Sequence, residues 1–74
     1  MTREEHLEWA KRRALEYVDR GDLEEAFASL GTDFDKHPDL KGAVRIHVEL
    51  GMPMLLGGML DRPDDMIRFI NGFH

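Results

Sequence analysis

Hydrophobic residues recur every three or four positions along most of this chain, which is the period of an amphipathic helix rather than of a strand. The first helix is predicted over residues 3–20, between a Thr2–Glu5 capping box and Gly21, with an apolar stripe of Leu7, Ala10, Ala14, Tyr17 and Val18. The second is predicted over residues 22–37, with Asp22 as N-cap, and its stripe consists of Leu23, Ala26, Phe27, Leu30 and Phe34. Because only Gly21 and Asp22 separate the two helices, we expect an antiparallel hairpin.

A third helix is predicted over residues 42–58, and its hydrophobic residues are too numerous for one stripe: Val44, Ile46, Val48, Leu50, Leu55 and Leu56. A helix that is apolar on most sides is normally buried, so we expect it at the centre of the molecule, with its surplus apolar face covered by a second copy or a partner. Pro53 lacks a backbone donor and clashes with the preceding turn, which predicts a kink or a break near that residue. Gly57 and Gly58 end the helix.

A short last helix is predicted over residues 63–71, where Pro63 and the acidic residues Asp64 and Asp65 suit a helix N-terminus. Its wide apolar face consists of Met66, Ile67, Phe69, Ile70 and Phe73. The chain is therefore predicted to be a single all-α domain, residues 1–74, built as a compact array of about four helices. A chain of 74 residues is near the size at which one core barely offsets chain entropy, which favours a homodimer.

Two resemblances to known families rest on quoted stretches of the sequence. Residues 14–38, with "ALEYVDRGDLEEAF" and the later Pro38, resemble one tetratricopeptide-type helix hairpin, but no second copy of that repeat follows. The wider pattern of "RALEYVDRGDLEEAFASL", "KHP", "ELGM", "LLGGML" and "MIRFINGF" resembles small helical proteins of bacteriophage and prophage genomes that generally have no known function. The second resemblance implies an accessory protein that binds a host protein in the host cell cytoplasm, and it implies no catalytic residues.

The charge balance and the length of the apolar segments argue against two classes of partner. Acidic residues outnumber basic ones by 15 to 10, giving a net charge of −5, and this opposes binding to nucleic acid phosphates. The most apolar segment, residues 48–60, contains Glu49 and Pro53 and is shorter than the ~20 apolar residues of a membrane-spanning helix. The N-terminus lacks the apolar region of a signal peptide, so we expect a cytoplasmic protein.

The sequence contains no recognisable set of catalytic or metal-binding residues. Its four histidines, His6, His37, His47 and His74, include no pair at the i, i+3 or i, i+4 spacing that places two imidazoles on one helical face. The acidic run around "DFDKHPDLKG" differs from a calcium loop, because Pro38 stands where such a loop needs glycine. No nucleophile or phosphate-binding motif is present, so we predict neither an enzyme nor a bound metal or cofactor.

Two groups of residues are candidates for partner binding. Trp9 lies on the side of its helix opposite Leu7 and Val18, with its neighbours Arg12, Arg13 and Glu16, and it is either an exposed interface anchor or packed on arginine stems or the C-terminal segment. Met52, Met54 and Met59 either fill the core around the proline or form an adaptable binding surface.

The leading hypothesis is a small acidic binding module that blocks a host protein stoichiometrically, as an inhibitor or in an anti-defence role. The first alternative is a self-associating structural or regulatory subunit. The second is an oligomer that sequesters a small ligand, for which the only candidate cationic residues are Arg12, Arg13 and Arg45.

Overall fold

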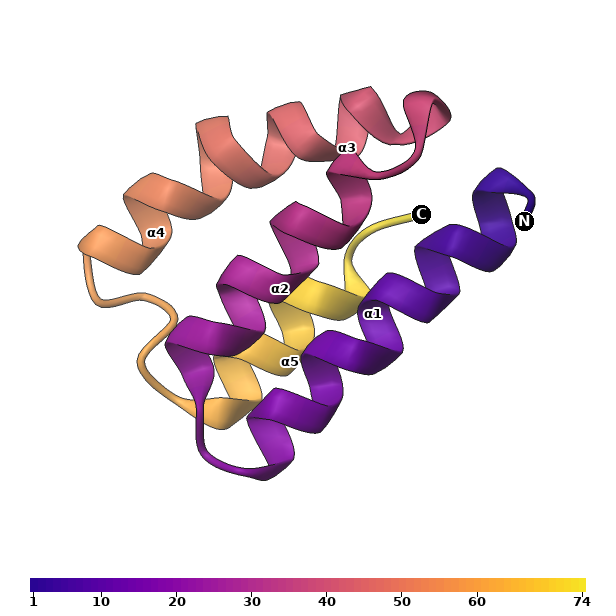
Figure 1. Ribbon diagram of the computed structural model, residues 1–74. Helices are drawn as coiled ribbons and strands as arrows, with labels where there is room; N and C mark the ends of the chain where they lie inside the picture. Colours follow the sequence, from indigo (N-terminus) through magenta and orange to yellow (C-terminus); the bar gives the residue numbers. More distant parts are fainter.

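The computed structural model describes residues 1–74 and is all-helical, as the sequence predicted (Figure 1). Its helices are α1 (Arg3–Asp19), α2 (Leu23–Asp35), α3 (Lys41–Ile46), α4 (Met52–Leu56) and α5 (Pro63–Asn71). A 3-10 turn, Pro38–Leu40, leads into α3, and a π turn, His47–Gly51, joins α3 to α4. Because α3, the π turn and α4 follow one another without a gap, residues 41–56 are called the α3–α4 helix below.

The first two helices form the predicted antiparallel hairpin, and most of its predicted signals are present. Thr2 and Glu5 make both hydrogen bonds of the capping box, at 3.1 and 2.9 Å. Gly21 has a φ of +81°, which suits the left-handed residue that ends α1. Asp22 is the N-cap of α2 but makes no side-chain capping bond. The second helix ends at Asp35 rather than at residue 37, because Pro38 holds the preceding residue, His37, in an extended conformation.

The proline in the third predicted helix is accommodated by a change of helix type. The π turn ends at Gly51, two residues before Pro53, and the backbone at Ile46, His47, Gly51 and Met52 keeps right-handed helical angles. A π turn inserts one extra residue into the turn, which relieves the clash that a proline ring makes with an ordinary α turn. The expected kink is therefore a π turn, and the helix runs on through Pro53 without a break (Figure 1).

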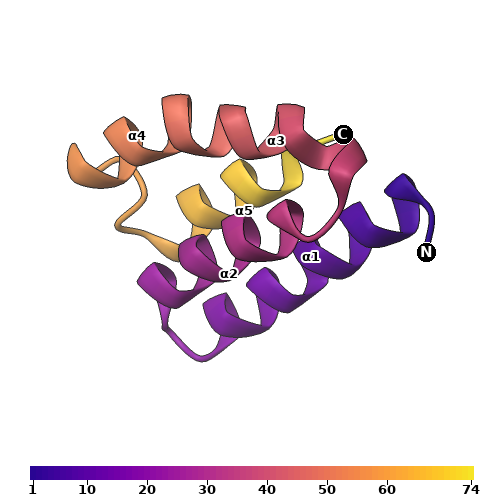
Figure 2. The ribbon, with the colours of Figure 1, turned by 45° about the horizontal axis from the view of Figure 1, so that its top comes forward.

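The core lies between α1, α2 and α5, and the α3–α4 helix covers its outside. Residues of α1 contact α2 and α5, whereas the α3–α4 helix contacts α2 and lies on the other side of α2 and α5 from α1 (Figure 2). The buried hydrophobic residues are Leu7, Ala10, Ala14, Val18, Ala26, Phe27, Leu30, Phe34, Leu40, Ala43, Leu60, Met66, Ile70 and Phe73. None of the helices combines the length and the apolar character needed to cross a bilayer.

The position of the α3–α4 helix corrects one expectation from the sequence. We expected residues 48–60 at the centre of the molecule, yet Ala43, His47 and Gly51 are the only buried residues of the whole α3–α4 helix. Its hydrophobic residues are spread around the helix, and only the row of Ala43, His47 and Gly51 is buried, whereas the positions on either side of that row are half-buried or exposed. The apolar composition of this helix therefore predicted that it is buried, but most of its large hydrophobic side chains are exposed.

Candidate protein-binding surface

The α3–α4 helix is held on the core by two close contacts at glycines. Gly31 of α2 lies under the ring of His47, so near that a Cβ on this glycine would lie 2.6 Å from Cε1 of His47. Gly51 of the π turn lies over two aromatic rings, and a Cβ there would lie 2.7 Å from Cζ of Phe69 and 2.8 Å from Cε2 of Phe27. Neither glycine has a positive φ, so both are needed for space rather than for backbone conformation.

His47 also makes the polar contact between the α3–α4 helix and α2. Its Nε2 atom donates a hydrogen bond of 2.8 Å to the backbone oxygen of Phe27, and its ring packs on the ring of Phe27 with centroids 4.0 Å apart. Burial lowers the pKa of His47 because the charged imidazolium loses its hydration there, and the hydrogen bond to Phe27 opposes this effect. Burial therefore favours the neutral imidazole at this contact, in the tautomer that donates through Nε2.

Outside these contacts, the α3–α4 helix and the turn after it expose an unusual number of large hydrophobic side chains. Leu56 is 80% exposed, Leu50 is 55% exposed and Met52 is 39% exposed. We call the whole set the apolar surface: Ile46, Val48, Leu50, Met52, Leu56 and Met59. Met1 is the one large exposed hydrophobic residue that lies outside this set. Exposed apolar side chains gathered on one segment mark an interaction surface more often than scattered ones do.

A groove of about 570 Å³ runs along one side of this helix, between it and α5. Its apolar lining comes from both sides and consists of Ala43, Ile46, Leu50, Met54, Phe69 and Phe73. Arg3 and Arg68 lie among the polar residues that line it. A second hollow, of about 530 Å³, lies on the opposite side of the α3–α4 helix, where Val44, Val48 and Met52 face α2. The helix is therefore a ridge with a depression on each side.

The Trp9 side of α1 has a different character, because its side chains contact one another. The Trp9 ring is partly buried against the core and lies 5.0 Å from the ring of His6. The Arg13 guanidinium carbon and the Lys36 ammonium nitrogen lie 5.1 and 5.6 Å from the centre of the Trp9 ring. Of the two arrangements that the sequence left open for Trp9, the structure shows packing against cationic side chains. Arg12 and Glu16 are exposed beside it.

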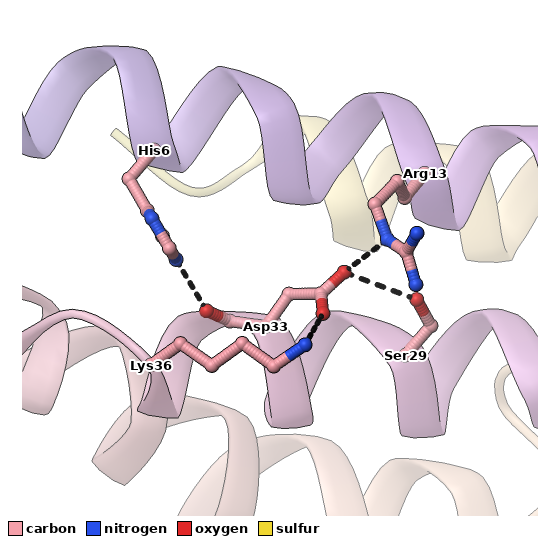
Figure 3. A network of polar contacts seen from close by, with 5 residues as sticks. All are labelled: His6, Arg13, Ser29, Asp33 and Lys36. Atoms are coloured by element: carbon pink, nitrogen blue, oxygen red, sulfur yellow. Dashed lines mark hydrogen bonds and ion pairs between the residues drawn. The ribbon is translucent and has the colours of Figure 1, made fainter. Parts of the chain in front are cut away.

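Asp33 connects the two helices of the hairpin beneath Trp9. Its side chain is almost fully buried and accepts hydrogen bonds from Nε of Arg13 at 2.7 Å and Nζ of Lys36 at 3.2 Å. Figure 3 shows Arg13 and His6 reaching across from α1, with the His6 ring donating to the backbone oxygen of Asp33 at 2.6 Å. Ser29 also donates to the carboxylate, at 3.4 Å. The hydrogen bond and the negative charge of Asp33 raise the pKa of Arg13.

The two predicted groups of partner-binding residues are thus far apart in the fold. Trp9, Arg12, Arg13 and Glu16 belong to α1, whereas Met52, Met54 and Met59 belong to or follow the α3–α4 helix, with α2 and α5 between the groups (Figures 1 and 2). Met52 and Met59 are exposed, and Met54 is half-buried in the groove. The three arginines named for ligand binding do not converge within one chain, because Arg45 lies on the α3–α4 helix and pairs with Glu49.

Several residues that define this surface were missed from the sequence. Neither His47 nor Gly31 has a role predicted from the sequence, although the two residues contact each other. The signal that could have located this contact is the pair of glycines inside predicted helices, Gly31 and Gly51. A glycine within a helix often marks the close approach of another element.

The positions of the ionisable side chains give no sign of a metal centre. No group of three or more histidine, aspartate or glutamate side chains is placed to hold a metal ion. Each of the four hollows of the surface is lined by apolar residues together with at least one acidic residue. The chain matches no family model, no curated protein and no solved structure.

Proposed function

We propose that this protein is a small binding module that acts by stoichiometric contact with another protein through the apolar surface of the α3–α4 helix. The observation that supports the proposal is the exposure of six large hydrophobic side chains on this one segment, beside a groove with an apolar lining. A protein partner is favoured because an apolar ridge flanked by depressions matches the helix-in-groove mode of recognition. The resemblance to phage and prophage proteins suggests a bacterial host protein as that partner.

Stoichiometric contact is favoured over turnover because of the chemistry available near the surface. The only polar side chains between residues 42 and 60 are Arg45, Glu49 and the buried His47. Arg45 and Glu49 bind each other, and His47 is occupied by its hydrogen bond to Phe27. The module would then act by covering a surface of its partner. The exposed methionines Met52 and Met59 suit this role, since thioether side chains adapt to an irregular partner surface.

The α1 side remains a predicted second contact. Because Arg13 binds the buried carboxylate of Asp33, replacing Arg13 would disturb the hairpin as well as any interface. Arg12 and Glu16 are exposed and are better probes of this side. We expect an Arg12→Ala, Glu16→Ala variant to weaken partner binding only if the partner also contacts α1.

The test is recovery of a partner from a bacterial lysate followed by reconstitution. Immobilised wild-type protein is compared with a Leu50→Lys, Leu56→Lys variant, and the control is Asn71→Lys, which adds a positive charge at an exposed position of α5. A recovered protein is purified, and its binding to each variant is measured by calorimetry. The proposal predicts a one-to-one complex with wild type and the control, and at least tenfold weaker binding to the double variant.

A reconstituted complex that binds the double lysine variant as tightly as wild type would contradict the proposed surface. If wild-type protein recovers only copies of itself, the self-associating subunit replaces the host-binding module. A thermal shift with small anions that is lost in Arg12→Ala would favour the ligand-sequestering alternative instead.

A further inference from the structure

The apolar surface lies on the most weakly charged part of the chain. Between residues 42 and 60 the only acidic and basic residues are Arg45 and Glu49, which carry opposite charges. The net charge of −5 therefore lies entirely on the remainder of the chain. Two copies of this acidic protein carry like net charge, and the α3–α4 helix, whose two charged residues cancel, lets them approach without adding to that repulsion.

The charges and hydrophobic residues of this helix are arranged in three parallel rows. Arg45 and Glu49 form an exposed ion pair, with Nε and Oε1 3.0 Å apart, along the outermost line of the helix. On the side of α5, the row is Ile46, Leu50 and Met54, which line the groove. On the side of α2, the row is Val44, Val48 and Met52, which line the second hollow. A single opposite-charge pair therefore stands between two apolar rows.

This pattern of charged and apolar rows is complementary to the same pattern running in the opposite direction. Suppose that a second α3–α4 helix packs antiparallel on the exposed side of the first, with a two-fold axis at the height of residue 47 along the helix. Arg45 of each copy then meets Glu49 of the other. The same axis brings the Ile46–Leu50 rows of the two copies together on one side and the Val44–Met52 rows together on the other. A parallel arrangement would instead place like charges opposite each other. Self-complementary patches of this kind form the isologous interfaces of two-fold dimers.

We propose that the occupant of the apolar surface is a second copy of this chain, packed antiparallel along the α3–α4 helix with reciprocal Arg45–Glu49 ion pairs. The inference rests on the proposed function, because it names one protein that the same surface binds. A standard dimer interface takes about 800 Å² from each partner, roughly a sixth of the 4743 Å² surface of this chain. The α3–α4 helix lies along one side of the molecule, where nothing in the chain covers it (Figure 2). A host protein would then bind by displacing the second copy.

The first test uses charge reversal, with association followed by sedimentation equilibrium. Arg45→Glu puts two acidic residues opposite each other at both ends of the interface, and Glu49→Arg puts two arginines there. We expect wild type to have twice the 8.6 kDa chain mass, and each single variant to associate at least tenfold more weakly. An equimolar mixture of the two variants should form a heterodimer, and the Arg45→Glu, Glu49→Arg double variant should regain the homodimer.

The charge-reversal variants change only exposed side chains, so thermal unfolding should confirm that each retains the fold. Rescue by mixing cannot come from a change in the stability of one chain. A wild-type monomer from micromolar to millimolar concentration would overturn the inference. Single variants that dimerise as well as wild type would also overturn it, because association would then use another surface.

The second test uses the absence of cysteine from the chain. In the proposed register, Val48 of the two copies lies about 3 Å apart along the helix axis, whereas Leu56 of the two copies lies about 27 Å apart, at 1.5 Å of rise per residue. Val48→Cys should therefore form a disulfide-linked dimer under mild oxidation, and Leu56→Cys should not. Equal cross-linking at both positions would indicate a parallel arrangement and contradict the inference.

The two proposals can fail separately. Loss of partner binding in Leu50→Lys, Leu56→Lys together with a monomeric wild type would keep the proposed function and remove the second copy. If the mixed charge-reversal variants form a dimer but wild type binds no host protein, the inferred dimer stands and the function is self-association.

Discussion

The α1–α2 hairpin and the α3–α4 helix differ in how many of their side chains find contacts within the chain. In the hairpin, the buried carboxylate of Asp33 is bound by Arg13 and Lys36, and Trp9 packs beside the same two cations. The α3–α4 helix instead buries only Ala43, His47 and Gly51 and leaves its apolar surface exposed. The hairpin satisfies its buried polar groups within residues 1–74, whereas the α3–α4 helix leaves large apolar side chains exposed there.

The largest effect is expected in the hairpin. Asp33→Ala removes the buried acceptor that both Arg13 and Lys36 use. We expect the free energy of unfolding to fall by about 3 kcal/mol, because hydrogen bonds to a charged group contribute ~1.5–3 kcal/mol each and Asp33 accepts several. Chemical denaturation measures this loss. Asp35→Ala, at an exposed position of the same helix, is the control and should change stability little.

A smaller effect is expected where the α3–α4 helix meets the core. Gly51→Ala places a methyl group 2.7 Å from Phe69 and 2.8 Å from Phe27, so the helix must shift outward. We expect a loss of about 2 kcal/mol, which is typical of overpacking. Gly42→Ala is the matched control, because a Cβ there meets nothing within 4 Å. Equal stability of the two variants in thermal unfolding would show that Gly51 does not hold the helix.

The same contact predicts a pH dependence through His47. Since burial lowers its pKa in the folded state, the unfolded chain binds the proton first as the pH falls. The contribution of His47 to stability is therefore constant above its unfolded value of 6.5 and is lost as the pH falls from there through the lowered folded pKa. His47→Gln, which does not titrate, should show a smaller loss of stability than wild type between neutral and acidic pH. Parallel stability curves for the two proteins would contradict this role.

The smallest effect on stability is expected at the apolar surface itself. Leu56→Gln changes a side chain that is already 80% exposed, so the folded monomer should lose less than about 0.5 kcal/mol. Protein binding should nevertheless weaken, because the same side chain would be covered in a complex. Thermal unfolding of dilute protein, compared with its binding isotherm, separates the two effects. A large loss of monomer stability would place Leu56 in the core rather than on a binding surface.

The sequence was sufficient for the fold class and insufficient for the exposed side. The Thr2–Glu5 capping box, Gly21 and the helical periodicity predicted α1 and α2 because these signals act locally. The pattern also indicated correctly that the α3–α4 helix is apolar on most sides. It could not show that the core buries only one row of this helix and leaves most of its large hydrophobic residues exposed. The contacts of His47 with Gly31 and of Asp33 with Arg13 join residues far apart in the sequence, and no local pattern predicts them.

The most direct test of the central claim is amide hydrogen exchange of the protein at micromolar and at millimolar concentration. If the α3–α4 helix is the incomplete side of the molecule, raising the concentration should slow exchange in residues 41–59 and leave residues 3–35 unchanged. Slower exchange around Trp9 with residues 41–59 unchanged would contradict the claim, whereas no change anywhere in the chain would rule out the second copy as the occupant.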